Sequence, residues 1–468
     1  MLVARIGDRG AAMRDRLARV RDAMASRSPE GLLVASFGGL IGLGTLLLNL
    51  PCSHRGSVGF LDALFTATSA VCVTGLIVVD TGTDYTVFGQ IVILLLIQAG
   101  GIGVMSFAGL AFYLLGRRLS LRAQAALSGS MLQREVASEF RGIFERILRF
   151  VLIAEFAGAL LLFAGMASSK GVGHAAYSAV FHAISAFCNA GFSLYSDSFT
   201  ALRGNPLVVI TVMLLIVLGG IGHPVMVDIW QRLLPSKKDE KHPNRKITLS
   251  SKVALWTSGL LILAGFAALV VSGLTPAESS WSERVFGALF QSVTARTAGF
   301  NTVDIGRLPL AAVFLLVMLM FIGGSPGSCA GGIKTTTFAV WLAKLRGRLA
   351  GDKSPRLFDR HIPGEITRRV SMIMGLAVIW NMVGVLLLLA TEGGSAGVGM
   401  HDVVFEQVSA FGTVGLSTGL TPKLSVIGQL WIIATMFVGR LGPLTLALWM
   451  FTRKAPGVRY PEGRIMIG

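Results

Sequence analysis

Eight long apolar segments follow one another along the chain. They lie at 32–50, 86–115, 147–168, 206–233, 253–273, 308–347, 367–391 and 424–452. A helix crosses the hydrocarbon core of a bilayer with about 20 mainly apolar residues, so each segment predicts a membrane span. Only 14% of the residues are charged and 57 are glycine, whereas a soluble protein needs more surface charge and packed membrane helices are rich in glycine. We therefore expect an all-α integral membrane protein with eight spanning helices.

The basic residues predict the orientation of these spans. Of the 42 Lys and Arg residues, 33 lie in five segments, namely 1–30, 117–149, 232–252, 344–369 and 453–464. Lys and Arg gather on the cytoplasmic side of membrane proteins, so both termini are expected there, as a basic N-terminal segment (1–31) and a C-terminal tail (453–468). The first is expected to form an amphipathic helix on the membrane or a solvated tail. None of these runs alternates with aromatic residues, which speaks against a nucleic-acid partner.

A shorter motif recurs four times between the long segments. It reads FTATSAVCVTGL at 65–76, FHAISAFCNAGF at 181–192, FQSVTARTAGFNT at 290–302 and FEQVSAFGTVGLS at 405–417. Each copy has a phenylalanine, a hydroxyl residue four positions later and a glycine. These glycines recur after 116, 108 and 116 residues. Because such a period indicates a structural repeat, we expect a short segment that enters the membrane and turns back.

A second glycine motif interrupts the following long segment in each copy. It reads GGIG at 100–103, GGIGHP at 219–224, GGSPGS at 323–328 and GRLGP at 439–443. Each repeat is therefore expected to run helix, short re-entrant pore segment, glycine-centred strand, second helix (M1-P-M2). The expected units are 32–116, 147–233, 253–347, whose second helix is broken, and 367–452, arranged around a single pore.

The four glycine-centred strands predict a filter for a monovalent cation. Irregular backbone at membrane depth must line a watery path or be buried in protein, and rings of carbonyl oxygens replace the water shell of such an ion. A calcium filter would carry acidic residues, and these strands carry none; Arg296 is expected behind the filter. The predicted filter residues are Val73, Thr74, Gly75, Asn189, Ala190, Gly191, Thr297, Ala298, Gly299, Thr413, Val414 and Gly415.

Acidic residues flank the predicted filter on its outer side. There they would gather cations at a pore mouth, or they are ordinary solvated loop residues; the sequence leaves both open. They are Asp62, Asp80, Asp84, Asp197, Asp304, Asp402 and Glu406.

With these motifs the chain resembles the Trk/Ktr/HKT superfamily of potassium transporters, whose members carry four non-identical channel-like units in one chain. The resemblance extends over residues 32–452 and is carried by the four filter glycines, RTAGFNT (296–302) and GGSPGSCAGGIKT (323–335). With one span expected before the first short segment, it looks closest to the KtrB branch, the membrane subunits of bacterial Ktr systems. It implies K⁺ uptake across a bacterial plasma or inner membrane. Glycine at position 75, where sodium-transporting relatives carry serine, implies K⁺ selectivity.

The same resemblance implies partners. It suggests a membrane homodimer and a cytosolic ring of regulatory RCK subunits of the KtrA or TrkA type, which bind ATP or ADP. The tail at 453–468 would lie near these contacts. The chain itself shows no nucleotide-binding motif, so no cofactor is expected on it besides the transported ion and membrane lipid.

Two features of the second helices predict gating. Residues 323–335 combine glycines with Pro326, which removes a backbone N–H, and no continuous helix is expected there. The resemblance identifies this stretch as an intramembrane gating loop; a kink that serves packing is the alternative. The predicted gating residues are Gly323, Gly324, Ser325, Pro326, Gly327, Gly331, Gly332, Lys334 and Arg440.

Arg440 is the most specific of these. It stands where the other three repeats carry a second glycine, and a charge in mid-membrane is costly and usually functional. We expect it below the filter, repelling a cation and binding carbonyls of the loop; a structural ion pair or carbonyl clamp is the alternative. The direction of Lys334 stays open.

Other functions are less consistent with the sequence. An inverted-repeat transporter would repeat twofold, and an intramembrane enzyme would need a nucleophile–base pair or metal ligands, which the histidines do not form with nearby carboxylates. We therefore expect a transporter, with a sodium-coupled potassium symporter or a less selective Na⁺ transporter of the same superfamily as the alternative.

Overall fold

The computed structural model of the chain describes residues 29–56, 58–116, 130–167, 171–233, 247–274, 281–351, 355–394 and 396–443. The described part is almost entirely helical. The segments expected to form the N-terminal amphipathic helix and the C-terminal tail lie outside the described residues, apart from the few residues of the former that begin the first described helix.

One order of elements recurs four times: a long helix, a short helix, an extended segment and a second helix. Group 1 consists of α2 (Pro29–Leu48), α3 (Phe60–Val71) and α4 (Val87–Gly116), and group 2 of α6 (Ser130–Met166), α7 (Val172–Phe187), α8 (Pro206–Ile221) and α9 (His223–Leu233). Group 3 consists of α10 (Leu249–Val271), α11 (Trp281–Thr294), α12 (Leu310–Phe321) and α13 (Thr335–Leu349), and group 4 of α14 (Gly364–Glu392), α15 (Met400–Gly412) and α16 (Val426–Leu441).

Short elements complete the described chain. The 3₁₀ turns η2 (Ile305–Arg307) and η3 (Thr421–Lys423) precede α12 and α16. A small antiparallel hairpin of β1 (Arg356–Leu357) and β2 (Arg360–His361) follows α13, with Arg356 paired to His361.

Local sequence explains where the second helices begin and break. Asn205 caps α8 and Pro206 occupies its first position, and Ser425 caps α16 through a hydrogen bond from the N–H of Gly428. Such residues satisfy the free N–H groups at a helix start. Segment 206–233 is not one straight helix, because Gly222 (φ +88°) separates α8 from α9, which are bent by 98°. In group 3, residues 322–334 separate α12 from α13.

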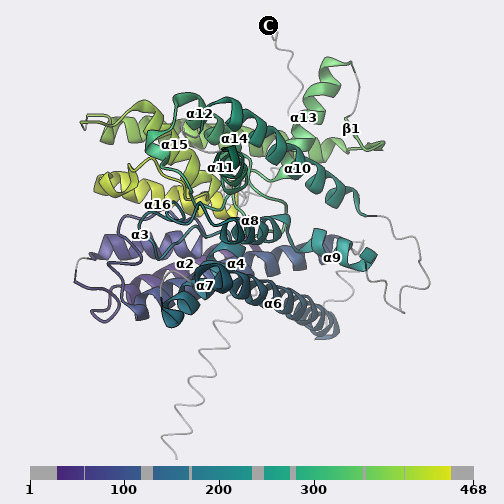
Figure 1. Cartoon of the computed structure of the whole chain (residues 1–468). Coiled ribbons are helices and arrows are strands. Elements are labelled where there is room, and N and C mark those ends of the chain that lie inside the picture. Colours follow the sequence, from purple (N-terminus) through teal and green to yellow (C-terminus); the bar gives the residue numbers. More distant parts are fainter. Residues whose placement is uncertain are drawn as a thin grey trace, which may run out of the picture.

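The four groups are arranged in a ring. The second helix of each group packs against the short helix of the next: α4 on α7, α8 on α11, α12 on α15, and α16 on α3. The last pair joins the end of the described chain to its beginning. Figure 1 shows the purple-to-teal helices of groups 1 and 2 in the lower half of the view and the green-to-yellow helices of groups 3 and 4 in the upper half.

The interior and the exterior of this body are both apolar. The phenylalanines that begin the repeated motif, Phe65, Phe181, Phe290 and Phe405, are all fully buried. In contrast, long helices expose large apolar side chains, among them Phe156, Leu260 and Leu386. Within the described residues, four helices are long and apolar enough to cross a membrane, and the bent pair α8–α9 makes a fifth. An apolar exterior of this extent indicates contact with lipid.

Candidate functional site

Four extended segments, each directly after a short helix, meet at the centre of the ring. We call them the central segments; they are 73–75, 189–191, 297–299 and 413–415, the twelve residues of the predicted filter. The first residue of each has a positive φ, at Val73 (56°), Asn189 (60°), Thr297 (78°) and Thr413 (49°). The glycine does too, at Gly75 (94°), Gly191 (70°), Gly299 (77°) and Gly415 (91°). The residue between them has a negative φ, and this alternation turns successive carbonyl groups toward one side.

The central segments close into a ring in sequence order. Each glycine lies so near the carbonyl oxygen of the next segment's middle residue that an added Cβ would collide with it. The pairs are Gly75 with Ala190, Gly191 with Ala298, Gly299 with Val414, and Gly415 with Thr74. Glycine is required here for two reasons: its φ is positive, and a Cβ would not fit beside the neighbouring carbonyl. The middle residue of every central segment places one carbonyl on the ring.

A hydroxyl group in each short helix holds the backbone at, or one residue after, its own central segment. Ser185 donates to the carbonyl of Phe192 at 2.8 Å, Thr294 to Phe300 at 2.7 Å and Ser409 to Leu416 at 2.6 Å. In group 1 the direction is reversed, because the N–H of Gly75 donates to Ser69 Oγ at 3.0 Å. These hydroxyl residues belong to the recurring motif, but the sequence alone assigned them no role. Their hydroxyl at one position in all four copies was the available signal.

A cavity of about 290 Å³ lies at the glycine end of the central segments. All four glycines line it, together with Asp80, Asp304 and hydroxyl residues such as Ser417. The Asp80 carboxylate accepts hydrogen bonds from the N–H groups of Gly82 and Thr83. Asp304 accepts from Gly306 and forms an exposed ion pair with Arg307 at 3.1 Å. Two of the seven acidic residues considered from the sequence thus line this cavity.

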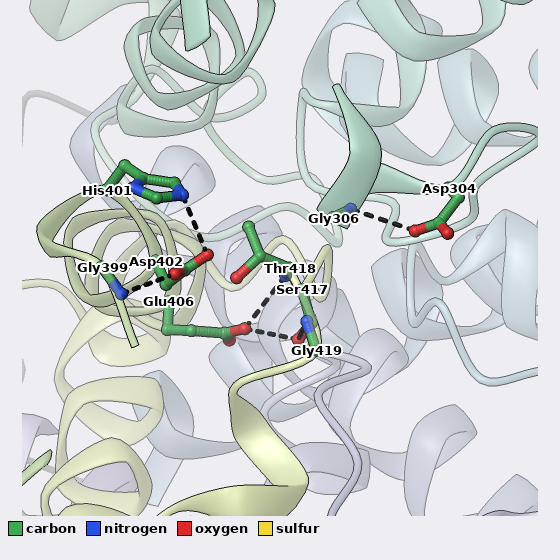
Figure 2. A network of polar contacts seen from close by, with 9 residues as sticks. All are labelled: Asp304, Gly306, Gly399, His401, Asp402, Glu406, Ser417, Thr418 and Gly419. Carbon is green, nitrogen blue, oxygen red and sulfur yellow. Dashed lines mark hydrogen bonds and ion pairs between the residues drawn. The ribbon is translucent and has the colours of Figure 1, made fainter. Parts of the chain in front are cut away.

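Glu406 supports the fourth segment from behind. Its side chain is fully buried on α15. It accepts hydrogen bonds from the hydroxyl of Ser417 and the N–H of Thr418 (Figure 2). It also accepts one from the hydroxyl of Thr421. It therefore fixes the turn that follows Gly415. In the sequence it is one of the acids read either as part of a pore mouth or as solvated loop residues. The pattern of α15, which also carries Asp402, does not reveal that Glu406 faces inward.

Residues 322–334, here called the central loop, lie at the opposite end of the central segments. An added Cβ at Gly331 would collide with the Thr413 side chain, and one at Gly323 would approach Thr297. The loop is anchored to group 2, where the N–H of Ser325 donates to Gly220 O at 3.0 Å and that of Cys329 to Gly219 O at 3.2 Å. These are the carbonyls that the helix break at Gly222 leaves without helical partners.

Arg440 joins the central loop to two other groups. Its guanidinium, 4% exposed, donates to the carbonyl of Cys329 in the loop and to that of Gly100 on α4, the second at 2.9 Å. The N–H of Gly332 donates to Gly439 O at 3.3 Å. The predicted gating residues thus lie together. The central loop contacts α8 and α16, and Arg440 links it to α4.

Two further cations lie at this loop. Lys334 donates to the carbonyl of Ala330 within the loop. Arg296 donates to Gly323 O at 2.8 Å and to Ser258 O on α10 at 3.0 Å, so it lies behind its central segment. The ends of the site therefore differ in charge, with carboxylates at the cavity and cations at the loop, of which Arg296 and Arg440 are buried.

Chemically, the site offers oxygen atoms of the main chain. Among the described residues, no group of three His, Cys, Asp or Glu side chains is arranged to hold a metal ion. The short helices end at Val71, Phe187, Thr294 and Gly412, at most two residues before the central segments begin, so the negative ends of their dipoles point at the ring. The carbonyl oxygens and the helix dipoles both favour a cation over an anion.

Comparison with known proteins places the chain among cation transporters. Residues 17–456 match the family model described as TrkH, cation transport protein. The chain is 36% identical to the potassium/sodium uptake protein NtpJ of Enterococcus hirae, over 94% of this chain and 97% of that protein. It is also 36% identical to the Ktr system potassium uptake protein B of Bacillus subtilis, with the same coverage, and to that of Vibrio alginolyticus over 96% of each chain.

A solved structure shares the fold. The crystal structure of the potassium transporter TrkH from Vibrio parahaemolyticus matches with a TM-score of 0.69 and 19% sequence identity. The match covers 91% of this chain and 85% of that one.

The ring contacts predict a difference between two glycines of equal φ. Gly415 (φ +91°) and Gly419 (φ +95°) are equally unfavourable for alanine, but only Gly415 lies against a neighbouring carbonyl. We expect Gly419→Ala to cost about 1–2 kcal/mol from backbone strain. Gly415→Ala should cost a further ~1–3 kcal/mol because the ring must open. Thermal unfolding of the purified protein in detergent measures both; equal losses in Tm would contradict the ring contact.

Proposed function

We propose that this chain, which belongs to the TrkH family of cation transport proteins, takes up potassium ions across a membrane through the ring of central segments. The observation that carries the proposal is the closed ring itself, with one uncharged backbone segment from each group. Carbonyl oxygens so arranged replace the hydration shell of K⁺. The names of the relatives, a potassium/sodium uptake protein and Ktr system potassium uptake proteins, support the same ion.

In this proposal the four groups are pore units and the long and second helices are eight spans. The short helices have 12 to 16 residues, at most about 24 Å. Each leads into a central segment at the middle of the ring, and so they are proposed to enter the membrane and turn back. The second helices of groups 2 and 3 instead continue beyond a break, as α9 and α13. The termini lie on the cytoplasmic side, as the distribution of Lys and Arg suggests. The membrane would be the bacterial plasma or inner membrane.

The central loop and Arg440 are the proposed gate. The loop lies under the segments. Arg440, on α16, donates to one carbonyl of the loop and to one of α4, and so links the loop to both helices. An ion leaving the ring would meet this guanidinium. Release of the loop would open the path and move the positive charge from it.

The proposed partners follow from the Ktr system. The relatives' names describe a protein of a system, which favours a regulatory cytosolic subunit, proposed to be an ATP- or ADP-binding RCK ring, and a membrane homodimer. The second candidate function is sodium-coupled or less selective uptake, favoured by the potassium/sodium name of the Enterococcus relative. Uptake of K⁺ into liposomes with and without a Na⁺ gradient separates the two.

Gly75 is expected to control selectivity. In Gly75→Ser the added side chain would displace the carbonyl of Ala190 and disturb the oxygen ring. Discrimination of K⁺ over Na⁺ should fall about tenfold, equivalent to ~1.4 kcal/mol, in flux assays on liposomes. Gly56→Ser is the matched control, because Gly56 has φ +99° but nothing near its Cβ position. Unchanged selectivity in folded Gly75→Ser would count against the filter.

Shortening the central loop is expected to remove the gate. Deletion of residues 325–330 takes away the hydrogen bonds to Gly219 and Gly220 and the Arg440 contact at Cys329. K⁺ flux per molecule should rise and depend less on a regulatory partner. Size-exclusion chromatography checks that the variant is folded. If a folded variant keeps its regulated flux, the loop serves packing alone.

Arg440 is expected to act as a barrier and as a clamp. Two unit charges ~6 Å apart repel by roughly 3 kcal/mol at an effective dielectric of ~20, and even half of this changes a rate about tenfold. Arg440→Ala should therefore raise K⁺ flux. Arg440→Lys keeps the charge but cannot bridge two carbonyls in the same way, so flux should rise less.

The control for Arg440 is Arg369→Ala, which removes an exposed ion pair with Glu365 on α14 and should leave flux unchanged. If both Arg440 variants lose folded protein and none of the remaining protein conducts faster, Arg440 is a structural clamp and no barrier.

A further inference from the structure

A second cavity lies away from the central segments, between α10, α13 and β1. It measures about 370 Å³. Leu260 and Leu261 of α10 and Phe338 and Leu342 of α13 form apolar walls, and Arg346 and Arg356 stand at its edge. Figure 1 shows α13 and β1 at the periphery of the helical body, with α10 beside them.

The apolar and basic parts of this cavity are separated along α13. Arg346 lies eight residues after Phe338 on the same helix, about 12 Å along its axis. The basic end is the last turn of α13, which also carries Arg348. The cavity is thus an open groove with apolar walls, of which Leu260 is 65% exposed. Two exposed arginines, here called its rim, lie near the end of α13. This is the distribution that fits an amphiphile with an anionic head.

The charge of the rim is not neutralised within the described residues. No carboxylate lines the cavity there, and neither Arg346 nor Arg356 takes part in an ion pair in that part of the chain. Both side chains are exposed. A guanidinium binds phosphate oxygens with two parallel hydrogen bonds, so two of them at one rim fit a phosphate.

We propose that this cavity binds one anionic phospholipid of the inner leaflet. Its phosphate lies between Arg346 and Arg356 and one acyl chain lies along Leu260 and Phe338. The assignment to the inner leaflet rests on the proposed function. In it, residues 344–369 are cytoplasmic, so the rim lies at the level of the lipid headgroups. Basic pockets between membrane helices on this side bind anionic headgroups. The central loop ends at Lys334, and α13 begins at the next residue. The lipid would therefore bind the helix that directly follows the loop.

Native mass spectrometry of the full chain in detergent tests the site with phosphatidylglycerol and phosphatidylcholine. We expect one phosphatidylglycerol to bind in preference. R346Q and R356Q should each weaken it about fivefold. Arg348→Gln is the matched control, because Arg348 lies in the same helical turn but does not line the cavity, and it should not change binding. Equal binding of both lipids, or equal losses in all three variants, would overturn the proposal.

A second variant tests the apolar part while both arginines remain. Ala339 lines the cavity, and Ala339→Phe should fill it and abolish preferential binding of phosphatidylglycerol in folded protein. Unchanged binding would overturn the proposal, and so would binding of free glycerol phosphate with equal strength. Loss of a dimer in R346Q/R356Q, without loss of lipid, would mean that a second copy covers the cavity. K⁺ uptake by the unaltered chain is measured separately: its failure would refute the transport function and leave lipid selectivity to be judged by itself.

Discussion

Irregular backbone inside an apolar helical body must find partners for its N–H and C=O groups, and the centre of this protein is organised by that requirement. The break after α8 exposes carbonyls that the central loop satisfies, and the loop's own carbonyls accept from Arg296 and Arg440. Each short helix adds a hydroxyl that bonds the backbone at, or one residue after, its central segment. On the proposed function, the carbonyls that still face the ring take the permeating ion as their partner.

The two ends of the ring impose different conditions on an ion. Asp80 and Asp304 line the cavity at the glycine end, where negative charge raises the local concentration of cations. At the other end lie Lys334 and Arg440, with Arg296 behind its segment. A uniform carbonyl ring has no preferred direction, so any directional control in the proposed pathway comes from the groups at its ends.

Much of this arrangement was predictable from the sequence because it repeats. The common register of Gly75, Gly191, Gly299 and Gly415 predicted four equivalent segments, and the position of Arg440 in that register predicted that it faces the centre. The specific partners were not predictable, since Arg440 bonds to Gly100 and Cys329 across 340 and 111 residues. The burial of Glu406 was missed because it occurs in one copy only, so no repeat distinguished it from a solvated acid. The number of spans and the gating roles remain predictions.

The closure of the ring also bears on how the protein is made. The segment at Gly415 packs against Thr74, and α16 packs against α3, so the first group lacks one of its two neighbours until the fourth has been synthesised. Contacts of such separation in sequence form late and slowly, and chains emerge N-terminus first. Three finished groups are therefore an open arc whose two ends lack the packing partners that α15 and α16 supply. Until the last helix is inserted, lipid or other protein must cover those apolar faces.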